Sequence, residues 1–213
     1  FKVEKSRQLI AVGLTAGFLF SSLSGCTTNP ATGESVFTGM SSNEQELRVG
    51  REQHPQIIKA FGGRFGSPEL RRYVDSIGQL LARTVERKTF KYTFTLLNSK
   101  IVNAFALPGG YIYISRGLMA LAENEAELAG VLAHELGHIN ALHHGRREGQ
   151  GLLANILLAG VGIAGGRAAA DLGSLVVGGA LRSYSREHEL ESDSLALRYM
   201  SRAGYDPEAM VYF

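Results

Sequence analysis

Two histidines and a glutamate near the middle of the chain have the types and spacing of a metal site. Residues 134–138 read HELGH and lie in a stretch, 124–144, that is predicted to be one long helix. Four residues turn a helix by about 400°, so His134 and His138 share one face. Glu135 lies about 100° away, where a carboxylate can take a proton from a metal-activated water. The motif therefore predicts a zinc site with a catalytic base, and the alternative is a pair of histidines without a metal.

Apolar periodicity and turn residues predict the elements that must position this motif. Helices are expected at 41–60, 67–85, 124–144 and 185–203, and strands at 91–97, 103–107 and 111–115, with a Pro-Gly-Gly turn at 108–110. The predicted fold class is α+β: a mainly helical domain with a small β-sheet beside the HExxH helix.

A segment rich in Gly, Ala, Leu and Val lies between the two long C-terminal helices, at residues 151–181. Its longest uncharged run, 151–166, is short for a membrane span. We interpret the segment as buried or flap-like helices, with a short interfacial segment as the alternative.

The N-terminal residues have the pattern of an export signal. Three basic residues among the first seven precede an apolar run at 9–23, which ends in the sequence LSGC. This ending resembles the bacterial lipobox and predicts a lipoprotein signal peptide at 1–25, with Cys26 as the lipidation site and membrane anchor. A signal anchor is the alternative. Residues 26–40 are expected to be a tether, and 41–213 the folded domain.

Composition supports an exported globular protein. Cys26 is the only cysteine, so no disulfide can form within the chain. Without residues 1–25 the chain has 19 basic and 19 acidic residues, which disfavours nucleic acid as a partner. Thr27 stands where many inner-membrane lipoproteins have aspartate, so the expected location is the outer membrane of a bacterial envelope, facing the periplasm.

Several separate segments match one known family in the same order. They lie at 29–33, 40–41, 50–51, 103–110, 134–138, 184–186, 189–193 and 203–207. The sequence resembles the HtpX-like and CAAX-prenyl-protease-like zinc metallopeptidases, most of all their bacterial periplasmic and lipoprotein members of the BepA and LoiP type. The family's later His-Pro motif, in the region that helps to stabilise the oxyanion, would lie beyond Phe213, and we interpret the chain as a fragment.

The resemblance implies a zincin-like domain of the gluzincin type that binds one zinc ion. Glu189 would join the two histidines as a ligand, and Asp193 would orient a ligand histidine. An edge strand would pair with extended polypeptide substrates; its residues are Asn103, Ala104, Phe105, Ala106 and Leu107. The implied function is cleavage of unfolded or misassembled envelope proteins, and the alternative is a chaperone or assembly factor with latent peptidase activity.

Helical phase also favours Glu189 over its acidic neighbours as the third ligand. Glu189 and Asp193 begin an apolar face, whereas Glu187 and Glu191 fall on a charged face expected to lie in water. A ligand must face the buried side, so Glu191 is predicted to be dispensable for zinc.

The remaining histidines are not expected to bind the metal. In a continuous helix His143 would point away from it, about 180° from His134. The others are flanked by polar residues or belong to the N-terminal helix: His54, His144 and His188.

Overall fold

The computed structural model describes residues 25–39, 41–160 and 184–212. Its elements are β1 (Cys26–Thr28), β2 (Ser35–Phe37), α2 (Asn43–Ala60), α3 (Pro68–Ala82), β3 (Thr93–Leu97), β4 (Ala104–Leu107), β5 (Tyr111–Ser115), α4 (Arg116–Met119), α5 (Glu125–Asn140), α6 (His143–Gly160), α8 (Arg186–Ala203) and the 3-10 helix η1 (Pro207–Tyr212). The predicted α+β class is confirmed. The predicted signal peptide up to residue 24, and the Gly- and Ala-rich segment from residue 161 onward, lie outside the described ranges.

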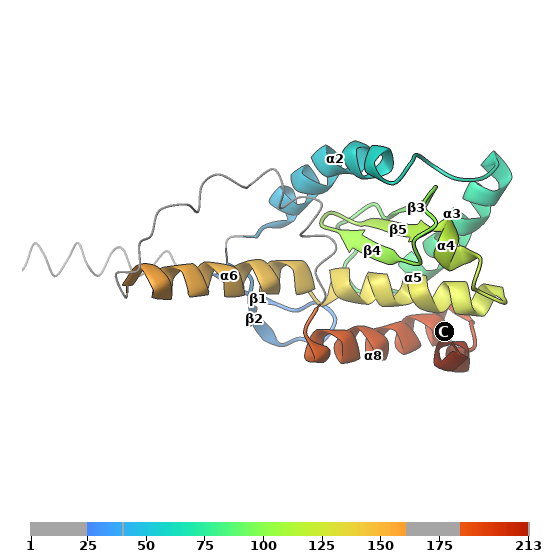
Figure 1. The fold of residues 1–213 in the computed structure, drawn as a ribbon. Helices are drawn as coiled ribbons and strands as arrows, with labels where there is room; N and C mark the ends of the chain where they lie inside the picture. Colours follow the sequence, from blue (N-terminus) through green and yellow to red (C-terminus); the bar gives the residue numbers. More distant parts are fainter. Residues whose placement is uncertain (1–24, 40, 161–183, 213) are drawn as a thin grey trace, which may run out of the picture.

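A three-stranded sheet separates the helices into layers. Its strand order is β3-β5-β4, with β3 parallel and β4 antiparallel to β5. Helix α2 lies on one side of the sheet, α5 on the other, and α8 beyond α5 (Figure 1). The β4–β5 turn needs its glycine pair, because Gly109 and Gly110 have φ of 82° and 92°. Strand β4 is thereby held at the edge beside α5.

Alternate side chains of β5 contribute to two separate hydrophobic clusters, one on each face of the sheet. Ile112 and Ile114 face the main core, which includes Leu132 and Leu136 of α5. Tyr113 points to the opposite face and packs in a smaller cluster with Ile57 of α2. Successive side chains of a strand point to opposite faces, so one short strand fixes helices on both sides. The helix that carries HExxH is therefore anchored on a buried sheet.

Helices α5 and α8 pack backbone to backbone at the motif itself. A Cβ atom on Gly137 would lie 3.0 Å from both the Cα and the carbonyl oxygen of Ser192. Only glycine lets two backbones pack at this separation without a shift. The absent side chain of Gly137 therefore brings the acidic residues of α8 up to the histidines of α5.

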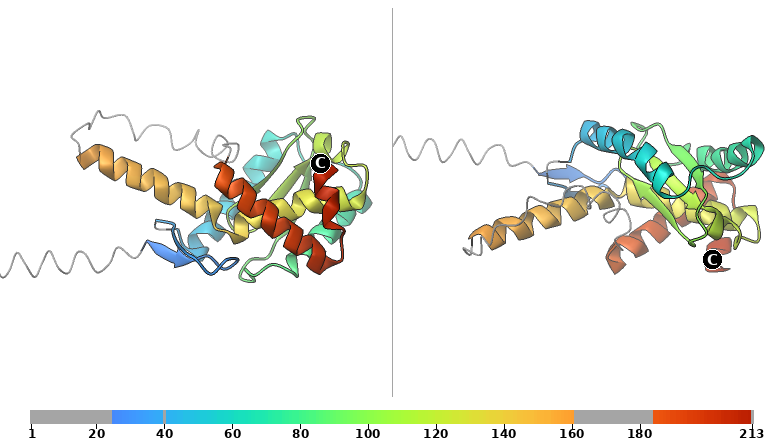
Figure 2. Two further views of the ribbon diagram at one scale, coloured as in Figure 1. Left: turned by 90° about the horizontal axis from the view of Figure 1, so that it is seen from below. Right: turned by 45° about the horizontal axis from the view of Figure 1, so that its top comes forward.

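The expectation of one helix over 124–144 is wrong. Helix α5 ends at Asn140, and α6 begins at His143. Between them Leu142 has a φ of 60°, the left-handed conformation that ends many helices. The chain changes direction there. The first half of α6 packs beside the β1–β2 hairpin, where Gly145 and Gly149 approach Thr38 and Phe37, and its far end extends away from the sheet (Figure 2).

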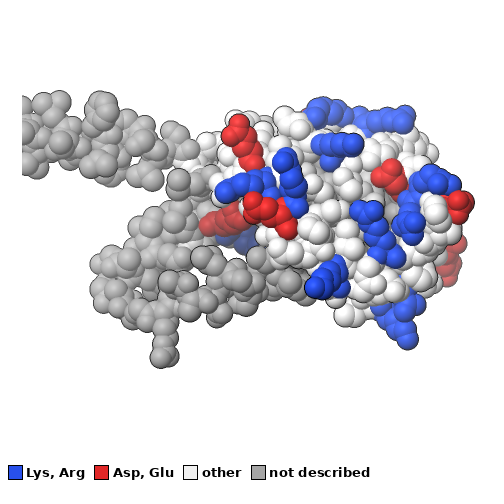
Figure 3. Space-filling view, turned by 90° about the horizontal axis from the view of Figure 1, so that it is seen from above, with Lys and Arg blue, Asp and Glu red and all other residues white. Residues whose placement is uncertain are grey.

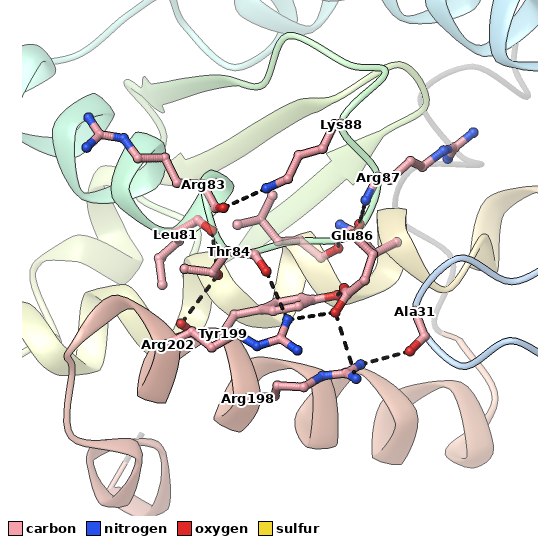
Figure 4. A network of polar contacts seen from close by, with 12 residues as sticks. Ala31, Leu81, Arg83, Thr84, Glu86, Arg87, Lys88, Arg198, Tyr199 and Arg202 are labelled. Carbon is pink, nitrogen blue, oxygen red and sulfur yellow. Dashed lines mark hydrogen bonds and ion pairs between the residues drawn. The ribbon is translucent and has the colours of Figure 1, made fainter.

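Residues 26–37 of the predicted tether are folded. Strands β1 and β2 form an antiparallel hairpin, and Asn29 between them is completely buried. Arg198 of α8 donates a hydrogen bond of 3.1 Å to the carbonyl oxygen of Ala31 and also lies beside Glu86 (Figure 4). The hairpin is thus fastened to the domain through α8.

The surface carries both signs of charge. Lysine and arginine side chains are spread widely over the face seen from above, with acidic side chains between and beside them (Figure 3). Among the helices of the described ranges, none has the length and apolar character that a membrane crossing requires.

Candidate metal centre

Three side chains from α5 and α8 converge on one point. The Nε2 atoms of His134 and His138 lie 3.0 Å apart, and Glu189 Oε2 lies 3.2 Å from the first and 3.8 Å from the second. Within the described residues, these three form the one group of His, Cys, Asp or Glu whose candidate ligand atoms all lie within 4.8 Å of one another. Two imidazole nitrogens and a carboxylate oxygen at these separations can bind a metal ion.

Asp193 lies behind the first histidine, one turn along α8 from Glu189. Its Oδ1 is 2.8 Å from His134 Nδ1. An ionised carboxylate only accepts hydrogen bonds, so the ring proton belongs on Nδ1 and the Nε2 lone pair faces the other candidate ligands. The pair has the form of a carboxylate–histidine–metal arrangement.

The side chain of Glu135 is buried next to the three candidate ligands. The residue is 8% exposed, and burial is the main reason that its pKa is raised to about 7. Glu189 raises this pKa further, whereas His134 and a hydrogen bond with the Ala106 backbone lower it. A carboxyl whose pKa lies near neutrality can accept and return a proton under ordinary conditions.

The backbone of the edge strand reaches the same place. Ser115 N–H donates to Asn103 C=O, so these two residues form a hydrogen-bonded pair. Along the β4–β5 ladder such pairs alternate with pairs that are not hydrogen-bonded to each other. Ala104 and Ala106 therefore turn their N–H and C=O groups away from β5. The Ala106 backbone contacts both Glu135 and His144. Strand β4 thus turns backbone groups away from the sheet beside the candidate base, and those of Ala106 are engaged by Glu135 and His144.

His143 does not point away from the site, contrary to the expectation from one continuous helix. Because the chain turns at Leu142, His143 Nδ1 comes within 2.8 Å of His138 Nδ1. Its Nε2 lies 3.1 Å from Glu191 Oε2. Helical phase alone suggested that Glu191 faces solvent. Instead, Glu191 contacts His143, and Arg146 also donates a hydrogen bond to it at 2.6 Å.

Tyr184 and His144 lie close to the motif, which was not anticipated from the sequence. The Tyr184 ring stacks on His138, with centroids 4.0 Å apart. Its hydroxyl lies 3.0 Å from Nε2 of His144. Burial lowers the pKa of His144 to about 3 and that of His143 to about 4, so both rings are neutral near pH 7. Tyr184 belongs to segment 184–186, one of those that match the known family, but nothing in its spacing indicated a contact with the motif.

The fold and these side chains define a class of protein. A helix carrying HExxH is packed on a small sheet, a second helix supplies a carboxylate, and a buried glutamate lies beside the point of convergence. This is the architecture of an HExxH metallopeptidase, in which a metal-activated water attacks a peptide bond.

Residues 68–213 match the family described as Peptidase family M48, so the chain belongs to this family. It is similar to the beta-barrel assembly-enhancing protease of Escherichia coli (strain K12), with 29% identity over 87% of this chain. It is also 26% identical over 77% of its length to the mitochondrial metalloendopeptidase OMA1 of Schizosaccharomyces pombe, and 30% identical over 63% to the metalloprotease YcaL of E. coli. The chain is therefore a member of a peptidase family whose named relatives include metalloproteases.

The similarity covers only part of these relatives. The chain spans 40% of the beta-barrel assembly-enhancing protease, 49% of OMA1 and 56% of YcaL. The match to the first of these covers more of the chain than the family region, 68–213, and so includes part of the segment before it.

Proposed function

We propose that this chain is the peptidase part of a zinc-dependent endopeptidase that cleaves unfolded or misassembled proteins of a bacterial envelope. The convergence of His134, His138 and Glu189 carries the proposal. A tetrahedral zinc ion with bonds of about 2.0–2.1 Å holds its ligand atoms roughly 3.3 Å apart. The separations of 3.0, 3.2 and 3.8 Å are near this value, and two nitrogens with one oxygen are donors that zinc accepts.

Each residue has a distinct task in the proposed reaction. Zinc, when bound, supplies Lewis acidity that acidifies a water and polarises the scissile carbonyl. Glu135 takes the proton from that water and delivers it to the leaving amine. Asp193 keeps the His134 ring turned so that Nε2 faces the metal, because it accepts the Nδ1 proton.

The substrate is proposed to bind as an extended strand along β4. The outward groups of Ala104 lie in the same strand as Ala106, whose backbone touches Glu135, so a chain paired with this edge passes beside the base. Asn103, Phe105 and Leu107 would complete the strand to which the substrate is added. Backbone pairing of this kind suits unfolded polypeptides, whose own groups are unpaired.

The envelope location rests on two observations outside the metal centre. The lipobox-like sequence before Cys26 supports a lipid anchor, and Cys26 is exposed at the start of β1. One relative is named for enhancing β-barrel assembly, which supports a role among envelope proteins.

Metal analysis combined with casein digestion tests the catalytic part. The purified protein should contain one zinc per chain, lose casein cleavage in a chelator and regain it with zinc. Glu135→Gln should keep the zinc but lose turnover by several orders of magnitude, because the ligands are intact and the proton acceptor is gone. Retained turnover would show that Glu135 is not the base.

The same variant separates the protease from the alternative function. If Glu135→Gln still relieves an envelope assembly defect while it cleaves nothing, the protein acts in the cell as a chaperone or assembly factor with a latent peptidase site.

A further inference from the structure

One buried histidine outside the ligand set connects the metal centre to the rest of the chain. His143 is completely buried and lies between His138 and Glu191, at 2.8 Å and 3.1 Å. Ser192 also approaches its Nδ1, at 3.3 Å. Both ring nitrogens of His143 therefore belong to one line of contacts, which runs from Glu191 through His143 to the candidate ligand His138.

The direction of the hydrogen bonds follows from the far end of this line. Glu191 receives hydrogen bonds from the Arg146 guanidinium at 2.6 Å and from the Asn29 amide at 2.9 Å. The Asn29 amide is oriented because its Oδ1 accepts from Ala31 N–H at 2.9 Å. A carboxylate surrounded by such donors acts as an acceptor, so His143 must donate to it from Nε2.

The proton positions in both rings then follow. With its proton on Nε2, neutral His143 has only a lone pair on Nδ1, and the 2.8 Å contact requires His138 to donate from Nδ1. Neutral His138 is left with its lone pair on Nε2, the atom that faces His134 and Glu189. The line of contacts therefore selects the tautomer that can bind a metal.

We propose that His143 and Glu191 are positioning residues for His138, and that Asn29 ties them to the folded segment that follows Cys26. Each histidine of the motif is then oriented by a carboxylate of α8, His134 directly by Asp193 and His138 through the ring of His143. This inference rests on the proposed role of His138 as a ligand.

The N-terminal segment is held to α8 at two points. The Asn29 amide donates to Glu191. Two turns further along the helix, Arg198 donates to the carbonyl oxygen of Ala31 (Figure 4). A backbone turn closed by Asn29 N–H to Glu34 C=O, at 2.7 Å, keeps the segment compact. Displacing the hairpin would remove a hydrogen-bond donor from the outer end of the line, so the geometry couples the position of this segment to zinc affinity.

Zinc affinity measured by chelator competition tests the proposal in the full chain. His143→Phe keeps a ring in the buried site but removes both hydrogen bonds, and Glu191→Gln removes the charge. Each should weaken zinc binding by about 10- to 100-fold, the usual effect of losing an outer partner of a ligand. Asn29→Ala should weaken it less, by about 2- to 10-fold, because Arg146 still holds Glu191.

Glu187→Gln is the matched control, since it makes the same charge change on an exposed residue of the same helix and should leave affinity within about twofold. Equal losses in Glu187→Gln and Glu191→Gln would overturn the proposal in favour of a general charge effect. Wild-type affinity in both His143→Phe and Glu191→Gln would overturn it directly.

Nitrogen-15 NMR of the histidine rings in the zinc-loaded wild-type protein needs no variant. His138 should carry its proton on Nδ1 and His143 on Nε2. A proton on His143 Nδ1 would overturn the proposal while leaving His138 as a ligand, whereas failure of the proposed function appears separately, as zinc that does not bind at His138.

Discussion

Three acidic side chains of α8 lie within five residues and have three different partners. Glu189 faces the Nε2 atoms of both motif histidines, Asp193 contacts His134 Nδ1, and Glu191 contacts His143. Helical phase separates Glu191 from the other two, because residues two apart differ by about 200° around the axis, whereas Glu189 and Asp193 lie one turn apart on the same face. Their substitutions should therefore have distinguishable effects on metal binding.

Glu189→Ala is expected to reduce zinc affinity by more than about 100-fold, beyond the range for an outer partner, because it removes a direct ligand. Glu187→Ala, two residues earlier on the exposed side, should leave both zinc content and peptidase activity near those of the wild type. Zinc content after gel filtration and chelator competition measure the difference. Similar losses in the two variants would mean that another group is the third ligand.

Asp193→Ala should have an intermediate effect. The variant keeps all three proposed ligands but frees the His134 ring to turn, which should weaken zinc by about 10- to 100-fold. At saturating zinc, Asp193→Ala should recover more activity than Glu189→Ala. An Asp193 variant that stays zinc-free under those conditions would instead make this carboxylate a ligand.

At the scale of the elements, the contact between α5 and α8 decides whether the ligands meet. The helices touch at Gly137, whose missing side chain lets Ser192 approach to 3.0 Å from the Cβ position. Glu189 lies one turn before Ser192 on the same helix, so a displacement of α8 moves the carboxylate away from both imidazoles.

Gly137→Ala should therefore weaken zinc binding without removing any ligand. The added methyl overpacks the interface, at a cost of about 1–3 kcal/mol in the free energy of unfolding. Gly151→Ala is the control, because a Cβ there meets nothing within 4 Å and alanine favours a helix by roughly 0.5–1 kcal/mol. Thermal unfolding with and without zinc measures both effects. A Gly137→Ala protein with wild-type zinc affinity would show that the helices have room to adjust.

Local patterns predicted most of the elements. Ser42, Ser67 and Ser185 each cap a helix whose start the sequence placed within a residue or two, and β5 has the predicted bounds. The break at Leu142 was missed because leucine is not a residue that commonly adopts positive φ. The contact of Asn29 with Glu191, 162 residues apart, depends on tertiary packing and leaves no periodic signal.

At the scale of the whole molecule, the N-terminal hairpin links a proposed membrane anchor to the catalytic domain. Cys26 begins β1, and Asn29 is already buried against the domain three residues later. A lipid on Cys26 would hold the domain close to the bilayer, because hardly any free chain separates the two.

Cys26→Ser should leave the protein unlipidated and move it from the membrane fraction to the soluble periplasmic fraction, since this cysteine is the one proposed anchor. Fractionation and metabolic labelling with a fatty acid measure the change, and peptidase activity on casein should be retained. A Cys26→Ser protein that remained in the membrane fraction would move the proposed attachment to another part of the chain, with 151–181 the first region to test.

The outward edge of β4 has a consequence for the lifetime of the proteins that this site meets. Backbone N–H and C=O groups are the same in every polypeptide, so an edge strand selects an extended, unpaired conformation more than a particular sequence. A folded protein must open locally before it can pair, and cleavage of the open form follows its equilibrium population when opening is fast. Each 1.4 kcal/mol of local stability then protects a client about tenfold. Under the proposed function, a protein's own folding stability sets how long it survives beside this peptidase.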